Sequence, residues 1–490
     1  MSTPPTPPYS QFRPQPQPGP KPRPQPARAK AAKPAEKAPP WGWLEWFTVM
    51  QTFMPAILFI PGISAVRTAT RIMAYLLGLF AWAGVVAGPK KGTTAGSFPA
   101  KPWLIFSMVW LTLSLAHPNS YSPIASLGHV VLYISILSPA FWAGDAVASP
   151  QQLRRVLAVL FLCNAASATM GLGQVFYPQR LNPPVIPVLA FHESNKGDLT
   201  YETADGRRVL RPCGLTDTPG AAAPAGAATA LIGLCFALRP IPWWRRLASV
   251  GLAFIGVAVI YYSQVRSSLV MLAICIVTVT GLFIYRRDYR SATVLAGGGA
   301  AMIGGALLWV ARTMGGRVFD RFGTLLNNSP VNVYSFNRGH FVMHAFEVLF
   351  ENPLGYGLGW WGMVHQALRD PFRISPVWVE VMMQAWAIDG GFPLLIGYGG
   401  AVVVAMLDSL RIALTNRDRE LSFWAAVVVA QNLSSVALCF SYPTFLSPTG
   451  LQFWLLAATL HAADAQSRAG QTSSGPKPKP RRRLWPRPAV

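Results

Sequence analysis

Long apolar runs recur along almost the whole middle of this chain, and they restrict its fold more than any other feature. Each run is about as long as an α-helix needs to be to cross a bilayer. Only 12% of the residues are charged, against about 25% in a soluble globular protein. The pattern predicts an all-α polytopic membrane protein. About twelve transmembrane helices are expected, near residues 44–62, 70–88, 102–117, 123–143, 152–176, 214–238, 245–262, 267–285, 293–311, 388–408, 420–441 and 446–463.

The two ends of the chain differ from this apolar middle because they are rich in proline and basic residues. Residues 1–40 contain seven Lys or Arg and one Glu, and residues 468–490 contain seven Lys or Arg and no acid. Such sequences are typical of extended, disordered chain. We therefore expect a disordered tail over residues 1–42, a transmembrane domain over residues 43–465 and a second disordered tail over residues 466–490.

The net charge of +23 does not indicate a nucleic-acid partner, because much of it lies in these two tails. Basic tails are expected on the cytoplasmic side by the positive-inside rule, where they interact with anionic lipid headgroups. A Pro-rich basic tail could also dock a partner protein, such as an SH3-like module or a chain-length or assembly partner.

Lys and Arg gather in alternate short connections between the spans. Arg154 and Arg155 lie before the fifth span, for example, whereas the connection 117–122 has no Lys or Arg. The positive-inside rule then predicts that both termini are cytoplasmic. Two long loops, near residues 177–213 and 312–388, would face outward. In the first, Asp205-Gly206 predicts a small β-hairpin, and the helical pattern of the second predicts an ordered cap.

The stretch from Asn337 to Trp361, in the second long loop, starts with an arginine on the apolar side of an amphipathic helix. A charge in that position is costly unless it meets an anion or a carboxylate. Two interpretations remain open: Arg338 pairs with an acid of the protein, or its guanidinium binds a phosphate or pyrophosphate. The apolar face contains Arg338, Phe341, Val342, Ala345 and Leu349, and the polar face contains His340, His344, Glu347 and Glu351.

The polar face of this helix has the spacing of metal ligands, at His340, His344 and Glu347. No fourth ligand is evident, and a solvated surface is the preferred interpretation. Four of the five cysteines fall inside apolar spans, Cys213 stands alone at a loop end, and no Cys-x-x-Cys spacing exists. We therefore expect neither a metal site nor a disulfide framework.

Two more arginines lie at the outward ends of predicted spans. Arg266, in YYSQVRSS, sits at headgroup depth, where it either snorkels to the surface or holds a lipid-linked phosphate. Arg211, in RPCGLTDTPGAAA, closes the first long loop. Asp217 follows it and could cap the next helix, orient Arg211 or act as a base.

Glu380 is an acid in a largely apolar stretch that leads into the tenth span, near Asp389-Gly390-Gly391. It is expected either to pair with one of the arginines or to act as a general base. Three outward arginines and such an acid suit one kind of reaction. They could hold a pyrophosphate leaving group while the acid activates a hydroxyl nucleophile.

With these motifs in this order, the chain resembles the O-antigen ligase and polymerase superfamily of bacterial membrane glycosyltransferases over roughly residues 45–465. The matching segments are RPCGLTDTPGAAA, QVRSSLVMLA and FNRGHFVMHAFEVLFENPLGYGLG. The resemblance implies a GT-C-like fold in the inner membrane. It also implies an inverting transfer, at the periplasmic face, from an undecaprenyl-pyrophosphate-linked glycan donor to a glycan or lipid acceptor, with no metal or other cofactor. Arg211, Arg266 and Arg338 would bind the pyrophosphate.

One position departs from the ligases of this family, which usually carry a histidine about eleven residues before the second glycine of the Gly390-Gly391 pair. This chain has Glu380 there. The first hypothesis is therefore a polymerase that joins oligosaccharide repeats into a surface polysaccharide, with Glu380 as base and His344 or His340 as alternatives. The second is a ligase that moves a finished glycan to lipid A core or protein. The third is a lipid-linked glycan flippase or transporter.

Overall fold

A computed structural model describes residues 41–62, 67–88, 97–184, 199–202, 206, 208–315, 319, 322–323, 329–367 and 377–473. Most of both predicted tails, residues 1–40 and 474–490, lies outside the described residues. So do parts of both long loops, including Asp205 of the predicted hairpin turn.

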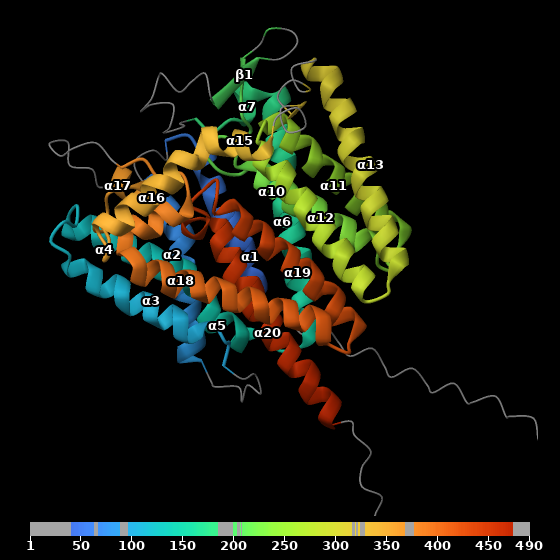
Figure 1. Cartoon of the computed structure of the whole chain (residues 1–490). Helices are drawn as coiled ribbons and strands as arrows, with labels where there is room; N and C mark the ends of the chain where they lie inside the picture. The colour runs from blue at the N-terminus through green and yellow to red at the C-terminus, as the bar shows by residue number, and fades with distance from the viewer. Residues whose placement is uncertain are drawn as a thin grey trace, which may run out of the picture. The chain divides into compact units, whose positions relative to one another are not determined.

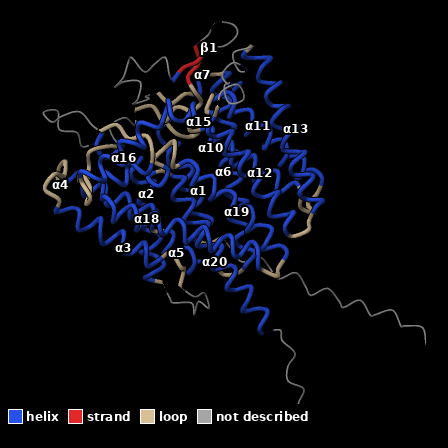
Figure 2. Tube along the Cα trace, viewed as in Figure 1, coloured by secondary structure: helices blue, strands red, loops and turns tan. Residues whose placement is uncertain are grey.

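The described residues form a bundle of α-helices joined by loops at its two ends (Figures 1 and 2). Eight helical segments in this part of the chain are long and apolar enough to cross a membrane, and the fold is that of an all-α membrane protein. The helices are α1 (Trp43–Phe53), η1 (Met54–Phe59), α2 (Arg67–Ala87), α3 (Lys101–Leu113), η3 (Ser114–Ala116), α4 (Pro123–Leu137), α5 (Pro139–Ala146), α6 (Pro150–Phe176), α7 (Pro178–Leu181), α10 (Ala222–Ala237), α11 (Trp243–Ser263), α12 (Arg266–Tyr285), α13 (Tyr289–Met314), α15 (Pro330–Tyr334), η5 (Ser335–Gly339), α16 (His340–Glu351), α17 (Gly362–Ala367), α18 (Met382–Thr415), α19 (Arg419–Leu438), η6 (Thr444–Leu446) and α20 (Pro448–Ser473).

Helices overlap every predicted span, but several boundaries differ from the prediction, among them those of α18, which was predicted only over 388–408. The span predicted at 123–143 is two helices, because Pro139 begins a new helix, α5. The span predicted at 214–238 is helical only from Ala222, after an irregular segment in which Gly214 and Gly220 adopt positive φ. Residues 466–473, expected to be disordered, continue α20, where the Asp464–Arg468 ion pair of 2.8 Å links successive turns.

The predicted hairpin is confirmed by two short strands, β1 (Thr200–Glu202) and β2 (Arg208–Leu210). They pair antiparallel, with Tyr201 opposite Val209. Between them Gly206 has a φ of +78°, the conformation for which glycine is favoured in tight hairpin turns.

The core of the bundle depends on close helix packing through small residues. A Cβ atom at Gly226 of α10 would lie 2.4 Å from the Gly256 carbonyl oxygen of α11, and a Cβ at Gly256 would lie 2.5 Å from the Gly226 oxygen. Glycine at both positions lets the two backbones approach. Nearly every side chain of α10 is buried as a result.

Helix α18 is broken at Gly391, which has a φ of +62°. Polar backbone groups exposed by a break inside a membrane need new partners. The loop after α16 supplies them: the Phe392 N–H donates to the Pro353 carbonyl (2.9 Å), and the Tyr356 N–H donates to the Ile388 carbonyl (2.8 Å). The break therefore fastens the loop that follows α16 onto α18.

Gly391→Ala should destabilise the protein strongly. A Cβ there would lie 2.1 Å from the Pro353 oxygen, and the positive φ adds strain. We expect a loss of at least about 2 kcal/mol in unfolding free energy, measured by thermal or denaturant unfolding in detergent. Gly399→Ala is the matched control, because a Cβ at this position of the same helix meets nothing within 4 Å. Equal stability of the two variants would contradict this account of the break.

Candidate functional site

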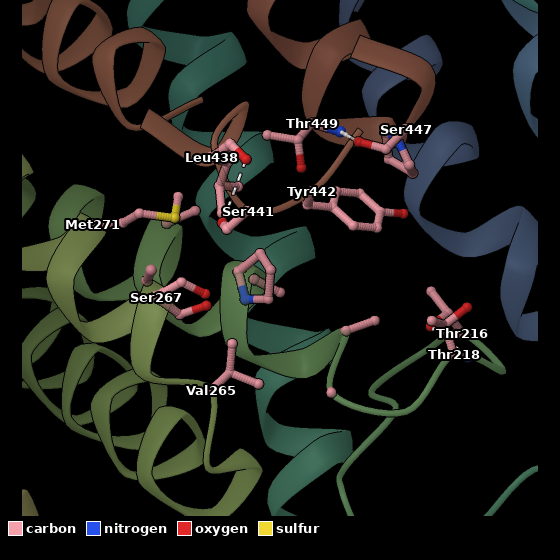
Figure 3. Close-up of a pocket in the computed structure, with 18 of the residues that line it drawn as sticks. Thr216, Thr218, Val265, Ser267, Met271, Leu438, Ser441, Tyr442, Ser447 and Thr449 are labelled. Atoms are coloured by element: carbon pink, nitrogen blue, oxygen red, sulfur yellow. Dashed lines mark hydrogen bonds between the residues drawn. The ribbon is translucent and has the colours of Figure 1, made fainter. Parts of the chain in front are cut away.

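The connections at one end of the bundle surround a cavity of about 590 Å³. We call this the hairpin end, since it carries β1 and β2 (Figure 1). The cavity enters the bundle between α1, α6, α10, α12, α19 and α20. We call the part lined by Arg211, Arg338, Trp378 and Glu380 the mouth, and the part lined by helix side chains the inner wall. Figure 3 shows lining residues from three separate segments around the space: Thr216 and Thr218; Val265, Ser267 and Met271; and Leu438, Ser441, Tyr442, Ser447 and Thr449.

Arg338 forms an ion pair with Glu380, and both line the mouth. Arg338 lies in η5, a single π-turn before α16, a geometry frequent at functional sites. The side chains are 33% and 21% exposed, so a ligand in the cavity can still reach them. Burial lowers the pKa of Arg338, an effect that Tyr334 opposes, and a guanidinium remains charged at neutral pH. Of the two interpretations of Arg338, the structure realises the pairing with a protein acid, at a place where an anion could also bind.

Glu380 is held by further hydrogen bonds that connect it to His344. Trp378 Nε1 donates to Glu380 Oε1 (2.6 Å). The Glu380 N–H donates to Gln384 Oε1 (3.2 Å), and Gln384 Nε2 lies 3.0 Å from His344 Nδ1. Three residues predicted for the site, Arg338, Glu380 and His344, therefore belong to one connected cluster. His340 does not join it; this exposed side chain lies against the ring of Phe341.

Arg211 reaches the same cavity from the irregular segment that precedes α10. This segment is fixed by polar side chains of α6. Gln174 Oε1 accepts from the Cys213 and Gly214 N–H groups (2.8 and 2.9 Å), and Ser167 Oγ accepts from the Leu215 N–H (3.2 Å). Bonding of this kind is what buried irregular backbone requires, and it positions Arg211 at the mouth.

Asp217 is buried and forms ion pairs with two arginines of α2. Arg67 Nε donates to Asp217 Oδ2 (2.8 Å), and Arg71 Nε donates to Asp217 Oδ1 (3.1 Å). The next helix, α10, has Ala221 as its N-cap, so Asp217 does not cap it. Sequence reasoning missed both arginines. Their signal was two arginines four residues apart at the start of the second predicted span.

Arg266 is the first residue of α12 and is half-buried. Its neighbours Val265, Ser267 and Ser268 line the cavity, but Arg266 does not. The structure therefore puts this arginine beside the cavity, and it is the one predicted arginine that is absent from the cavity lining.

A second polar cluster lies behind the break in α18, and sequence reasoning missed it as well. Asp389, 1% exposed, accepts from Tyr133 OH (2.7 Å) and Trp361 Nε1 (2.9 Å), and its Oδ2 lies 3.5 Å from His129 Nε2. Trp361 follows the loop that bonds to the break. The cluster therefore ties that loop to α4 and α18 at a second point.

Cys213 lies two residues after Arg211, in the irregular segment that precedes α10. Burial raises the pKa of its thiol to about 12, and the charge of Asp217 adds to the shift. The thiol is therefore neutral at physiological pH and acts as a small packing group instead of a nucleophile.

Asp217→Asn should destabilise the hairpin end, because it leaves Arg67 and Arg71 without their counter-charge. Removal of one partner of a buried ion pair costs about 3 kcal/mol, which thermal unfolding of the purified protein would detect. Asp145→Asn, at an exposed position, is the matched control and should change stability by less than about 0.5 kcal/mol. If Asp217→Asn unfolded at the same temperature as the unaltered protein, the pairing would not be structural.

No family model matches this chain, and none of the curated proteins matches it. What the site does must therefore be inferred from its own side chains and from the elements that hold them.

Proposed function

We propose that all twelve apolar segments cross a bacterial inner membrane, with both termini cytoplasmic and the hairpin end in the periplasm. The distribution of charge supports this orientation. At the end opposite the hairpin, Glu420 pairs with Arg154 and Arg239 (3.0 and 3.7 Å), and further arginines remain in excess. At the hairpin end, Arg67 and Arg71 share the acid Asp217, and Arg338 is paired with Glu380. An excess of basic residues is typical of cytoplasmic connections.

We propose further that the protein is a glycosyltransferase that polymerises undecaprenyl-pyrophosphate-linked oligosaccharide repeats into an O-antigen, capsule or exopolysaccharide. The observation that carries this proposal is the meeting of Arg211, Arg338 and Glu380 in one cavity between membrane helices. Guanidinium groups suit a pyrophosphate because they form paired hydrogen bonds with its oxygens. A cavity that opens among membrane helices is within reach of a substrate that a long lipid anchors in the bilayer.

The proposed reaction needs one base and one anion site. A hydroxyl oxygen of the acceptor glycan attacks the anomeric carbon of the donor, and its proton goes to the Glu380 carboxylate. The bond from that carbon to the pyrophosphate oxygen breaks, and undecaprenyl pyrophosphate leaves with the electron pair. Arg338 and Arg211 stabilise the negative charge that develops on the leaving group. The positive charge of Arg266, which lies beside the cavity, adds to this stabilisation. Attack from the opposite face inverts the anomeric configuration.

The position of His344 keeps a ligase as the alternative. In that case His344, linked to Glu380 through Gln384, would be the base, and a finished glycan would move to lipid A core or protein. A flippase or transporter is a weaker alternative, because the charged residues among the described cavity lining all lie at the mouth and not along a path through the membrane.

Arg338→Lys and Glu380→Gln should each reduce polymer formation roughly 100-fold in cells. Lysine keeps the charge but not the paired hydrogen bonds, and glutamine cannot accept the proton. The measurement is the length distribution of lipid-linked glycans, which should shorten to single repeats. Arg154→Lys, in an ion pair at the opposite end, and Glu347→Gln, on the exposed face of α16, are matched controls with normal chain lengths. Long lipid-linked glycan that accumulates in the Arg338→Lys strain would instead identify a ligase. Normal lengths of lipid-linked glycan together with normal glycan on lipid A core or protein in both variant strains would refute both enzymes.

The proposed orientation can be tested by cysteine labelling in intact cells. Phe336, 87% exposed near the mouth, and Trp243, 77% exposed at the opposite end, offer matched positions. In a Cys439→Ser background, where the remaining cysteines are buried, a membrane-impermeant maleimide should label Phe336→Cys but not Trp243→Cys. The reverse pattern would overturn the orientation.

A further inference from the structure

Carboxamide side chains line the inner wall of the cavity at a depth where membrane helices are usually apolar. Gln431 precedes the end of α19 at Leu438 by seven residues, which puts it about 10 Å below the hairpin end of that helix. Gln51 of α1 and Asn164 of α6 line the same wall and are 5% and 6% exposed. Polar residues inside membrane helices are costly and mark functional sites.

Gln431 and Ser268 are the most informative residues of this wall. Gln431 is 8% exposed, and its carboxamide makes no hydrogen bond with any residue that the structure describes. Ser434 and Ser435 donate only to its backbone carbonyl (2.9 and 3.1 Å). Ser268 Oγ, fully buried, also lacks a partner within the described part of the chain. Buried polar groups without partners cost free energy, so a ligand that fills the cavity these residues line would relieve that cost by bonding to them.

The inner wall differs from the mouth in charge. The charged residues among the described lining are Arg211, Arg338 and Glu380, and all three belong to the mouth. A carboxamide both donates and accepts hydrogen bonds, which matches a sugar hydroxyl or acetamido group. An isoprenoid chain would need no such groups, and an acidic sugar buried here would lack a cation.

We infer that the inner wall binds a neutral sugar of the lipid-linked glycan through the Gln431 carboxamide and the Ser268 hydroxyl. This inference rests on the proposed function, in which the pyrophosphate stays at Arg338. It adds a substrate class: the sugar next to the pyrophosphate carries hydroxyl or acetamido groups and no carboxylate, sulfate or phosphate.

Equilibrium binding of three short-chain probes to the purified full-length protein tests this inference. The probes are farnesyl pyrophosphate, the same lipid pyrophosphate bearing N-acetylglucosamine, and the same bearing glucuronic acid. The N-acetylglucosamine probe should bind about tenfold more tightly than farnesyl pyrophosphate, as one or two new hydrogen bonds allow, and the glucuronic acid probe should show no such gain. Gln431→Leu should remove the tenfold gain while farnesyl pyrophosphate still binds normally, which also shows that the variant is folded. Ser268→Ala should reduce the gain in the same way.

Asn432→Leu is the matched control, since this neighbouring buried amide does not line the cavity and has no partner among the described residues. It should leave the binding of all three probes unchanged. A gain that persists in both Gln431→Leu and Ser268→Ala, or equal binding of the glucuronic acid probe, would overturn the inference while the pyrophosphate site stands. If farnesyl pyrophosphate bound equally well to Arg338→Ala, or not at all to the unaltered protein, the proposed function itself would fail.

Discussion

The broken backbone of α18 at Gly391 is the constraint on which the candidate site depends. Glu380 and Gln384 lie in the stretch that leads up to the break, and Arg338 and His344 lie in η5 and α16, which lead up to the loop that bonds to it. Because Pro353 and Tyr356 supply the hydrogen bonds that the helix has lost, the two segments are held together at a fixed register. Trp110 adds a third bond, from its indole N–H to the Gly390 carbonyl (2.8 Å). The Arg338–Glu380 pair is thus positioned by backbone bonds several residues away.

Several arginines lie at the hairpin end, and three of them form ion pairs with acids of the protein. Asp217 pairs with both Arg67 and Arg71 and balances one of their two positive charges, and Glu380 balances the charge of Arg338. These two pairs differ in exposure. Asp217 is only 2% exposed and serves packing, whereas Arg338 and Glu380 face the cavity and can exchange their contacts for those of a substrate. This difference favours a binding and catalytic role for Arg338 over a purely structural one.

The sequence was sufficient for much of the fold and part of the site, as particular residues illustrate. Long apolar runs located the helices, and Asp205-Gly206 located the hairpin, because both are local signals. Glu380 was expected either to pair with an arginine or to act as a general base, and in the structure it pairs with Arg338. The partners of Asp217 and Asp389 were not foreseen, because most of them lie far away in the chain. The partners of Asp217 come from α2, and Tyr133, which donates to Asp389, comes from α4. The irregular start of α10 was missed since Gln174, which bonds its backbone, lies about forty residues earlier. Contacts over such separations follow from helix packing, which a single sequence does not specify.

Transfer by the purified protein tests the central claim most directly. The protein in detergent would be given undecaprenyl-pyrophosphate-linked repeat units alone, and the lipid-linked products would be separated by length and their new linkage examined by NMR. We expect longer lipid-linked glycans, one undecaprenyl pyrophosphate released for each new bond, and an inverted anomeric configuration at that bond. Unchanged repeat units, or a retained configuration, would contradict the claim.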